Sequence, residues 1–412
     1  MAATLITGKH WRYISAKPAA RWALRWVYLL LFAAVCMPWL ANHKPLYCKI
    51  EGKTQWPVWQ EWAAGYGLVR LDPGFFRRDW KQQTYQRVIW PLIPYSSSTQ
   101  DLNNSNFRGP FEKQQVSRVR FRHWLGTDRL GRDVAAGMIS GARIAILVGI
   151  GSMGIASLLG LLLGGIGGFF GNDGLRLRRS TLVFALMGLL FAGYGAWLAR
   201  LSLTGWIKTL ALFAVILLLF LIIAWGWRRI KPTGRQWTIP ADSILMRLIE
   251  LFNSIPALLV LLALVALIRK PSVVNILIII GLIRWTGIAR YLRAELLRIR
   301  SMEYIEAARA IGLTEWRILW RHALPNALPP VLVTIAFGIA SAVLLEAALS
   351  FLGLGVSAEQ VTWGTLLGLA RENFSAWWLA AFPGIAIFLT VTSFNVIGQA
   401  FSEALDARQQ SN

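Results

Sequence analysis

Residues 304–325 read YIEAARAIGLTEWRILWRHALP and lie between two long apolar runs, so this stretch is a loop between membrane spans. Glu306 begins a group of strong helix formers, and Gly312 predicts the end of that first helix. Glu315–His322 predicts a second short helix, and Pro325 either stops it or opens the next one. This basic helix–glycine–helix elbow suits docking on another protein, although an ordinary cytoplasmic loop of a polytopic membrane protein would look similar.

The apolar runs around this elbow predict an all-α, polytopic membrane protein. The chain has 412 residues, of which 56% are hydrophobic and only 15% are charged, and its mean hydropathy is +0.49. A soluble domain of this length carries more charge and shorter apolar runs. Stretches long enough, or nearly so, to cross ~30 Å of hydrocarbon predict about eight spans. They are Trp26–Asn42, Ile144–Asn172, Thr181–Ala199, Thr209–Trp227, Leu251–Ile268, Ser272–Ala289, Ala323–Leu345 and Asn373–Ser402.

The distribution of positive charge predicts the orientation of these spans. The formal net charge is +23, and Arg and Lys concentrate in the segments that a cytoplasmic N-terminus would place inside. The short outer connections, 200–208 and 269–271, hold few of them. Cytoplasmic loops of membrane proteins carry this excess. We therefore expect cytoplasmic N- and C-termini, contacts of basic residues with anionic membrane lipid, and no nucleic-acid partner.

The long connection after the first span predicts a separate outer domain. Within it, KPLYCKIEG (44–52) and QRVIWPLIPY (86–95) have the alternation typical of strands. This domain is either a docking surface for a periplasmic substrate-binding protein or a cap over the outer mouth. The expected order is a cytoplasmic lead (1–25), a first span (26–42), the outer loop domain (43–140), a second span (141–174), a helical hairpin (175–240) and a last part (241–408).

The end of the outer loop reads HWLGTDRLGRD at residues 123–133. Asp128 and Asp133 lie five residues apart with two arginines between them, which predicts local ion pairs and helix caps. Gly126 and Gly131 permit a tight turn. A capped turn explains the two carboxylates better than a catalytic pair does, because no nucleophile or base accompanies them.

Sequence blocks within 123–170 and 241–408 occur in the order of a known family. EAA at 306–308, a glycine after three residues and a later Leu-Pro resemble the EAA loop of permease subunits of ABC importers. HWLGTDRLGRD and EAALSFLGLG (346–355) are similar to motifs of the peptide-type group, which comprises dipeptide, oligopeptide and nickel permeases. The opening of the outer loop, ANHKPLYCKIEG, resembles the microcin C and oligopeptide branch. The matching residues are Gly126, Thr127, Asp128, Gly131, Arg132 and Asp133 in the outer motif, and Glu306, Ala307, Ala308, Gly312, Leu324 and Pro325 in the loop.

The resemblance implies the inner-membrane permease subunit of an ATP-driven peptide importer. Its core would have six helices, so residues 175–240, which do not match that core, would be an inserted two-helix hairpin. The resemblance further implies separate ATPase subunits that grip residues 303–325, a second related permease and a periplasmic substrate-binding protein. ATP and Mg²⁺ would bind to the ATPase partners, and no cofactor is expected on this chain. Nickel or another small solute stays open, because the motifs serve the whole group.

The sequence itself carries no machinery for driving transport, so we do not expect an enzyme. It has no GxxxxGK[ST] phosphate loop, and its four histidines form no metal-ligand spacing. An ion-coupled secondary transporter is the remote alternative, but it needs buried carboxylates or inverted repeats that the spans lack. Arg284 is a candidate pathway residue, or else it snorkels to the interface. Glu346 is a second candidate, with a salt bridge or helix cap as the equal alternative.

Overall fold

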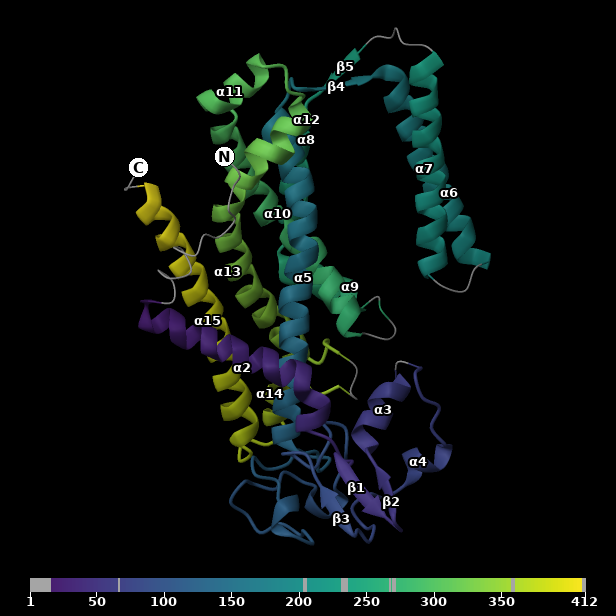
Figure 1. The fold of residues 1–412 in the computed structure, drawn as a ribbon, viewed down its shortest axis with the longest axis vertical. Helices are drawn as coiled ribbons and strands as arrows, with labels where there is room; N and C mark the ends of the chain where they lie inside the picture. Colours follow the sequence, from purple (N-terminus) through teal and green to yellow (C-terminus); the bar gives the residue numbers. More distant parts are fainter. Residues whose placement is uncertain are drawn as a thin grey trace.

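The computed structural model describes residues 16–65, 67–202, 206–230, 236–266, 268, 272–356 and 360–409. Long helices form an elongated bundle with a small mixed domain at one end and a separate helical hairpin at the side (Figure 1). The expected lead up to residue 15 and the expected connection 269–271 lie outside the described residues. The long helices are α2 (Pro18–Leu40), α5 (Val134–Phe170), α6 (Arg179–Ser202), α7 (Trp206–Ile230), α10 (Val273–Ile299), α13 (Leu324–Phe351) and α15 (Trp378–Gln409).

The described residues contain six helices that are long and apolar enough to span a membrane, or up to seven if one bent pair counts as a span. Helix α7 contributes only a shorter apolar stretch, Leu212–Ala224. The expected count of about eight spans is therefore not reached, and the span expected at Thr209–Trp227 stays a prediction. The six helices are Pro18–Leu40, Val134–Phe170, Arg179–Trp197, Val273–Ile299, Glu315–Phe351 and Trp378–Leu405.

The span expected at 251–268 is broken rather than continuous. Helix α8 (Ala241–Asn253) and helix α9 (Ala257–Ala266) meet at an angle of 72°. Pro256 lies in the break, and proline lacks the N–H that would continue the helical hydrogen bonds. Helix α8 is amphipathic, with Asp242, Arg247 and Glu250 among its residues, whereas α9 is wholly apolar, so the bend separates an amphipathic entry helix from the apolar arm.

Helix α5 begins earlier than expected, at Val134 rather than near residue 144. Asp133 caps it, because its Oδ1 accepts a hydrogen bond of 2.7 Å from the backbone N–H of Ala136. With 37 residues the helix is ~55 Å long, well beyond the ~30 Å of hydrocarbon. It therefore reaches from the membrane into the outer domain.

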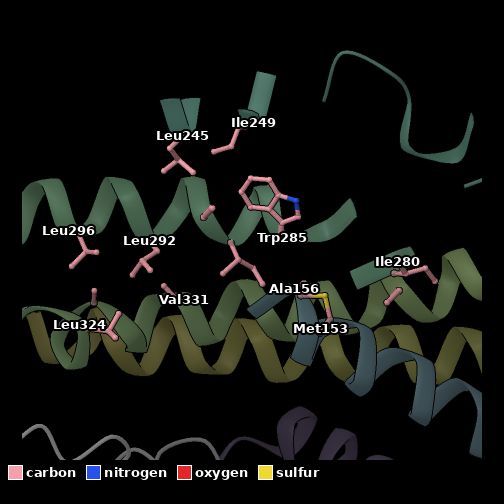
Figure 2. Packing of buried hydrophobic residues seen from close by; sticks show 14 of the residues in the cluster. Met153, Ala156, Leu245, Ile249, Ile280, Trp285, Leu292, Leu296, Leu324 and Val331 are labelled. Atoms are coloured by element: carbon pink, nitrogen blue, oxygen red, sulfur yellow. The ribbon is translucent and has the colours of Figure 1, made fainter. Parts of the chain in front are cut away.

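The core of the bundle lies where α5, α10 and α13 meet. Glycines of α5 allow a close approach to α10: a Cβ on Gly160 would lie 2.7 Å from Ile288, and one on Gly164 would lie 2.6 Å from the carbonyl oxygen of Ala289. Small residues permit such contacts between membrane helices. Figure 2 shows the side chains that fill this core, with Leu292 and Leu296 of α10 facing Leu324 and Val331 of α13. The same cluster continues into the elbow at 303–325.

The outer domain contains a small antiparallel sheet of order β2–β1–β3. Strands β1 (Tyr47–Ile50) and β3 (Arg87–Ile89) lie in the two predicted stretches and pair with each other, whereas β2 (Lys53–Gln55) was not expected. Two short helices, α3 (Pro57–Gly65) and α4 (Pro73–Arg77), and single turns complete the domain. The chain is therefore a helical membrane protein with a small mixed outer domain.

Helices α6 and α7 form a hairpin that stands apart from the bundle (Figure 1). A two-stranded ribbon of β4 (Leu175–Arg178) and β5 (Gln236–Ile239) connects it to the rest, with Leu175 opposite Ile239. The helices confirm the helical character expected for 175–240, and the ribbon was not expected. That this segment is an insertion into a family core stays a prediction.

Candidate functional site

The loop at 303–325 folds as an elbow at the end of the bundle opposite the outer domain (Figure 1). Helix α11 (Glu303–Ala310) forms the first arm and helix α12 (Glu315–Ile318) begins the second. A π-helical turn at Leu319–Ala323 then runs directly into α13. Pro325 lies in the first turn of α13, so it opens that helix rather than stopping the second arm.

The corner of the elbow is fixed by Gly312, which confirms the predicted helix end. Its φ is +80°, a backbone conformation that residues with a side chain adopt only at a cost in free energy. The N–H of Gly312 donates to the carbonyl of Arg309 (2.9 Å), and the N–H of Leu313 donates to that of Ala308 (3.2 Å). This pair of bonds is the Schellman motif. A Cβ on Gly312 would meet no atom within 4 Å, so the backbone rather than space requires glycine.

One face of the elbow packs against the bundle. Ile305 and Ala308 of α11 and Ile318 of α12 are buried in the main core. Trp316 packs on Phe170 at the end of α5, with ring centres 4.9 Å apart. These contacts join the elbow to α5, so that it moves with the bundle.

Charged groups also fasten the two arms to each other. Arg309 donates from Nε to Glu315 Oε1 over 2.9 Å, and its Nη2 donates to Oε2 over 3.3 Å. Arg309 is one of the arginines that make the elbow basic, and the structure uses it within the elbow. Arg317 and Arg321 are exposed and remain available to a partner.

The opposite face of the elbow is open to solvent. Glu306, Ala307 and Gly312 lie on it, whereas Ala308 and Leu324 are buried and Pro325 is half-buried. Ile311 is 77% exposed at the corner itself, and Trp316 and Trp320 are about half exposed. The sequence analysis did not single out these three apolar residues. For Ile311, the available signal was an apolar residue directly before the glycine that ends the helix. An exposed apolar tip with flanking charges is a surface suited to a protein partner.

The predicted motif at 126–133 forms a hydrogen-bonded knot at the outer end of α5. Asp128 Oδ1 accepts from the backbone N–H groups of Leu130 (2.8 Å) and Arg132 (2.9 Å), and its Oδ2 accepts from Arg132 Nε (2.6 Å). Both Gly126 and Gly131 have positive φ. Thr127 is buried, and its hydroxyl donates to the carbonyl of Asn104 (2.7 Å). The ion pair and the cap predicted for the two aspartates are confirmed.

A buried histidine that the sequence interpretation left out stands at the centre of this knot. His123 is fully buried, with Nδ1 2.7 Å from Asp133 Oδ2 and Nε2 3.3 Å from Asp101 Oδ2. Its ring lies 4.2 Å from the ring of Tyr95. Burial raises the pKa of Asp101, but hydrogen bonds from Asn104 and His123 outweigh that effect and leave the pKa below its usual value. The knot is therefore a structural element that holds α5 to the outer domain.

Comparison with known proteins places these features in a family. A sequence profile of the "binding-protein-dependent transport system inner membrane component" family matches residues 233–411, which include the whole elbow. The dipeptide transport system permease protein DppC of Bacillus subtilis (strain 168) is 30% identical over 324 residues, covering 78% of this chain and 77% of that protein. The chain belongs to this family of permeases.

Two further relatives extend the similarity along the permease. The peptidoglycan transport system permease protein YejE of Agrobacterium fabrum is 28% identical over 430 residues, which cover 98% of this chain and 93% of that protein. The dipeptide transport system permease protein DppC of Alkalihalophilus pseudofirmus is 29% identical over 325 residues, 79% of this chain and 82% of that protein. The similarity therefore includes regions upstream of the profile match.

Membership defines the broad role of the permease. It is an inner-membrane, multi-pass subunit of an ABC importer, with ATPase and binding-protein partners, and it is a transport component rather than an enzyme. The ion-coupled secondary transporter considered from the sequence is thereby ruled out. Among the residues that the structure describes, no group of three or more His, Cys, Asp or Glu side chains could hold a metal ion.

The two candidate pathway residues of the permease have different surroundings. Arg284 is half-buried within the spanning helix α10, next to the buried Trp285. Glu346 of α13 is only 2% exposed and accepts a hydrogen bond of 2.7 Å from the hydroxyl of Ser350. Thr362, which caps α14 (Trp363–Ala370), also hydrogen-bonds to Glu346. Glu346 thus lies inside α13 beside two hydroxyl groups, and no helix cap or salt bridge by its carboxylate is seen among the described residues. The pathway role of Glu346 and that of Arg284 stay predictions.

Proposed function

We propose that this permease forms half of a translocation pathway for short peptides, with a second related permease forming the other half. The support comes from relatives whose similarity covers most of this chain, beyond the residues that match the family profile. Two of the reported relatives are named dipeptide permeases and are 29% and 30% identical over more than three quarters of this chain. Arg284 is the residue of this chain that we expect to line the pathway.

The elbow at 303–325 is the proposed coupling site for the ATPase subunits. The observation that carries this assignment is an exposed apolar tip, Ile311, on a corner locked by Gly312 and packed against α5. A partner that grips the tip can move the bundle, because the buried face of the elbow is continuous with the main core. Closure of the ATPase dimer on ATP would thus switch the pathway from inward-facing to outward-facing.

The two ends of the chain support a cytoplasmic position for both termini. Lys17, just before α2, forms an ion pair with Glu403 of α15, and Ala20 packs beside Ala404. The first and last spanning helices therefore share one end. Figure 1 places the end of α15 on the half of the molecule that holds α11. The excess of Arg and Lys in the inner segments agrees with this orientation and with contacts to anionic lipid.

The outer domain then faces the periplasm, where we propose that a substrate-binding protein docks. Large apolar side chains on its surface support docking over a purely structural cap: Leu92 and Leu102 are each 78% exposed and Phe111 is 86% exposed. These exposed side chains leave apolar surface available to a protein partner.

Uptake of radiolabelled trialanine by cells that produce or lack this chain tests the proposed substrate class. We expect uptake to be lost on deletion, to return with the wild-type gene, and to stop when ATP is depleted while the proton gradient is clamped. Uptake that is unchanged by deletion would refute the peptide assignment. Radioactive nickel in the same assay tests the alternative of another small solute.

A second candidate substrate class is a peptide that carries peptidoglycan sugars. It is favoured by the relative named as a peptidoglycan transport permease, which matches 98% of this chain. Competition distinguishes the two classes. If a muropeptide blocks trialanine uptake at lower concentration than unlabelled trialanine does, the peptidoglycan-derived class is the preferred substrate.

A further inference from the structure

The outer domain encloses a cavity of about 620 Å³ that the transport assignment does not use. Its lining residues come from four stretches of the chain, at 43, 78–82, 95–103 and 115–121, which belong to the small domain at the foot of Figure 1. Its size is that of pockets which hold small molecules. Among its lining residues are His43, Arg78, Trp80, Lys81, Tyr95 and Asp101.

Lys81 is the first sign that this cavity suits an anionic group. Its Nζ lies 3.2 Å from the centre of the Tyr95 ring and 5.2 Å from that of Phe121, and it ion-pairs with no carboxylate in the described part of the chain. Burial lowers the pKa of Lys81 to about 8, although Asp101, Asp133 and Asp79 act to raise it. Lys44, a fully buried lysine of the same domain, is by contrast paired with Glu61 at 2.5 Å.

Two buried polar atoms of lining residues are the second sign. Trp80 is 2% exposed, and its indole Nε1 finds no acceptor among the described residues. The Nδ1 atom of His43 is likewise buried and without a partner there. Buried donors in proteins are nearly always satisfied, so each orphan calls for an explanation. Tyr95, by contrast, donates its hydroxyl proton to the carbonyl of Phe121 over 2.7 Å.

The carboxylates on the cavity wall are already engaged. Asp101 accepts from the side chain of Asn104 (2.8 Å) and from the backbone N–H of Asn103 (3.1 Å), in addition to its contact with His123. Asp79 accepts from the backbone N–H of Lys81 over 2.9 Å. Because these carboxylates already accept hydrogen bonds, the cationic groups of Lys81 and Arg78 are the parts of the wall that can pair with an anion.

We propose that this cavity binds a small ligand through a carboxylate, with the Lys81 ammonium as charge partner and the Trp80 indole N–H as hydrogen-bond donor. A short peptide fits the volume and supplies such a carboxylate at its C-terminus. Arg78, whose guanidinium lies 5.2 Å from the centre of the Trp80 ring, adds positive charge at the same wall. The site stands on the outer domain and does not depend on which solute crosses the membrane.

Calorimetric titration of the purified full-length chain in detergent tests this site without any transport. Trialanine and trialanine amide are the two probes, because they differ only in the terminal charge. We expect trialanine to bind at least 10-fold more tightly than the amide. Equal binding of the two probes, or binding of neither, would overturn the proposal, and this comparison needs no variant protein.

Substitutions then assign the binding to the cavity. Lys81→Met should weaken trialanine binding at least 10-fold and leave the amide unchanged, and Trp80→Phe should weaken it several-fold while keeping the ring. Lys53→Met is the matched control, because Lys53 is an exposed lysine of the same domain on strand β2, outside the cavity. Circular dichroism and elution as a single species verify that each variant is folded. Trialanine affinity that survives Lys81→Met would place the peptide elsewhere.

Discussion

Trp378 and Thr127, 251 positions apart in sequence, are joined by a hydrogen bond from the indole Nε1 to the backbone carbonyl over 3.1 Å. The contact links the first turn of α15 to the outer knot. Gly126 makes it possible, because a Cβ there would lie 2.9 Å from the same indole nitrogen. The last spanning helix is thus tied to the outer domain by one buried side chain.

Removing that tie should loosen the outer domain in a graded manner. Trp378→Phe replaces the indole with a smaller aromatic ring and loses the hydrogen bond, which by itself corresponds to about 1 kcal/mol of unfolding free energy. Trp378→Ala also leaves a cavity and should cost about 3–5 kcal/mol. Thermal unfolding of the detergent-purified chain measures both variants. Equal effects of Phe and Ala would show that the hydrogen bond, rather than packing, holds the contact.

The corner of the elbow should tolerate only residues that accept a positive φ. Gly312→Val forces a β-branched residue into that conformation at a cost of about 1–2 kcal/mol, so the corner should shift and transport should fall. Gly312→Asn is the matched control, because asparagine adopts this conformation more readily. ATP-dependent uptake is compared with membrane insertion for both. Normal uptake by the valine variant would refute the assignment of the elbow as the coupling site.

The exposed tip of the elbow should contribute directly to ATPase binding. Ile311→Glu places a charge at the centre of the proposed contact, and we expect co-purification of the ATPase subunits to fall about 10-fold, which is ~1.4 kcal/mol. Leu92→Glu is the matched control on the outer domain, with 78% exposure against 77% for Ile311. Equal retention of the ATPase by both variants would contradict the docking surface.

The ion pair between Asp242 and Arg293 should stabilise the bundle because it is largely shielded from water. The side chains are 17% and 23% exposed, and Arg293 contacts the carboxylate of Asp242 through both Nε and Nη2. A double-mutant cycle with Asp242→Asn and Arg293→Met should give a coupling energy of about 1–3 kcal/mol. The exposed pair of Arg247 and Glu250, on the same helix α8, is the control.

For that control pair, whose side chains are 84% and 57% exposed, the cycle should give at most about 0.5 kcal/mol. Denaturant unfolding in detergent supplies the free energies. Similar coupling in the two pairs would mean that shielding from water does not strengthen the first.

Acidification should weaken the outer domain through His43. Burial lowers the pKa of His43, and the neighbouring Lys44 and Lys81 act in the same direction, against a raising effect of Glu61. The unfolded chain then takes up the proton first as the pH falls below ~6.5, so stability is full above that pH and declines below it. Limited proteolysis of the outer domain at pH 7.5 and pH 5.5 measures the decline. His43→Gln should make this loss of stability smaller. If the loss is unchanged, groups other than His43 cause it.

The sequence determined the class of the protein because hydropathy and charge are local properties. Long apolar runs can only be buried in lipid or in a core, and the order of the motif blocks pointed to the permease family that the comparisons then showed. The ends of the elbow helices were also predictable, since Gly312 and Pro325 act on their own backbone. The capping role of Asp133 was predictable for the same reason.

Only the tertiary structure decided which side chains face a partner and which face the core. Ala308 and Ala307 are neighbours in one motif, yet the first is buried and the second exposed, because only one side of α11 faces the main core. The ribbon of β4 and β5 and the cavity beside Lys81 likewise depend on segments distant in sequence. Such contacts are fixed by packing between elements, and no local pattern of residues records them.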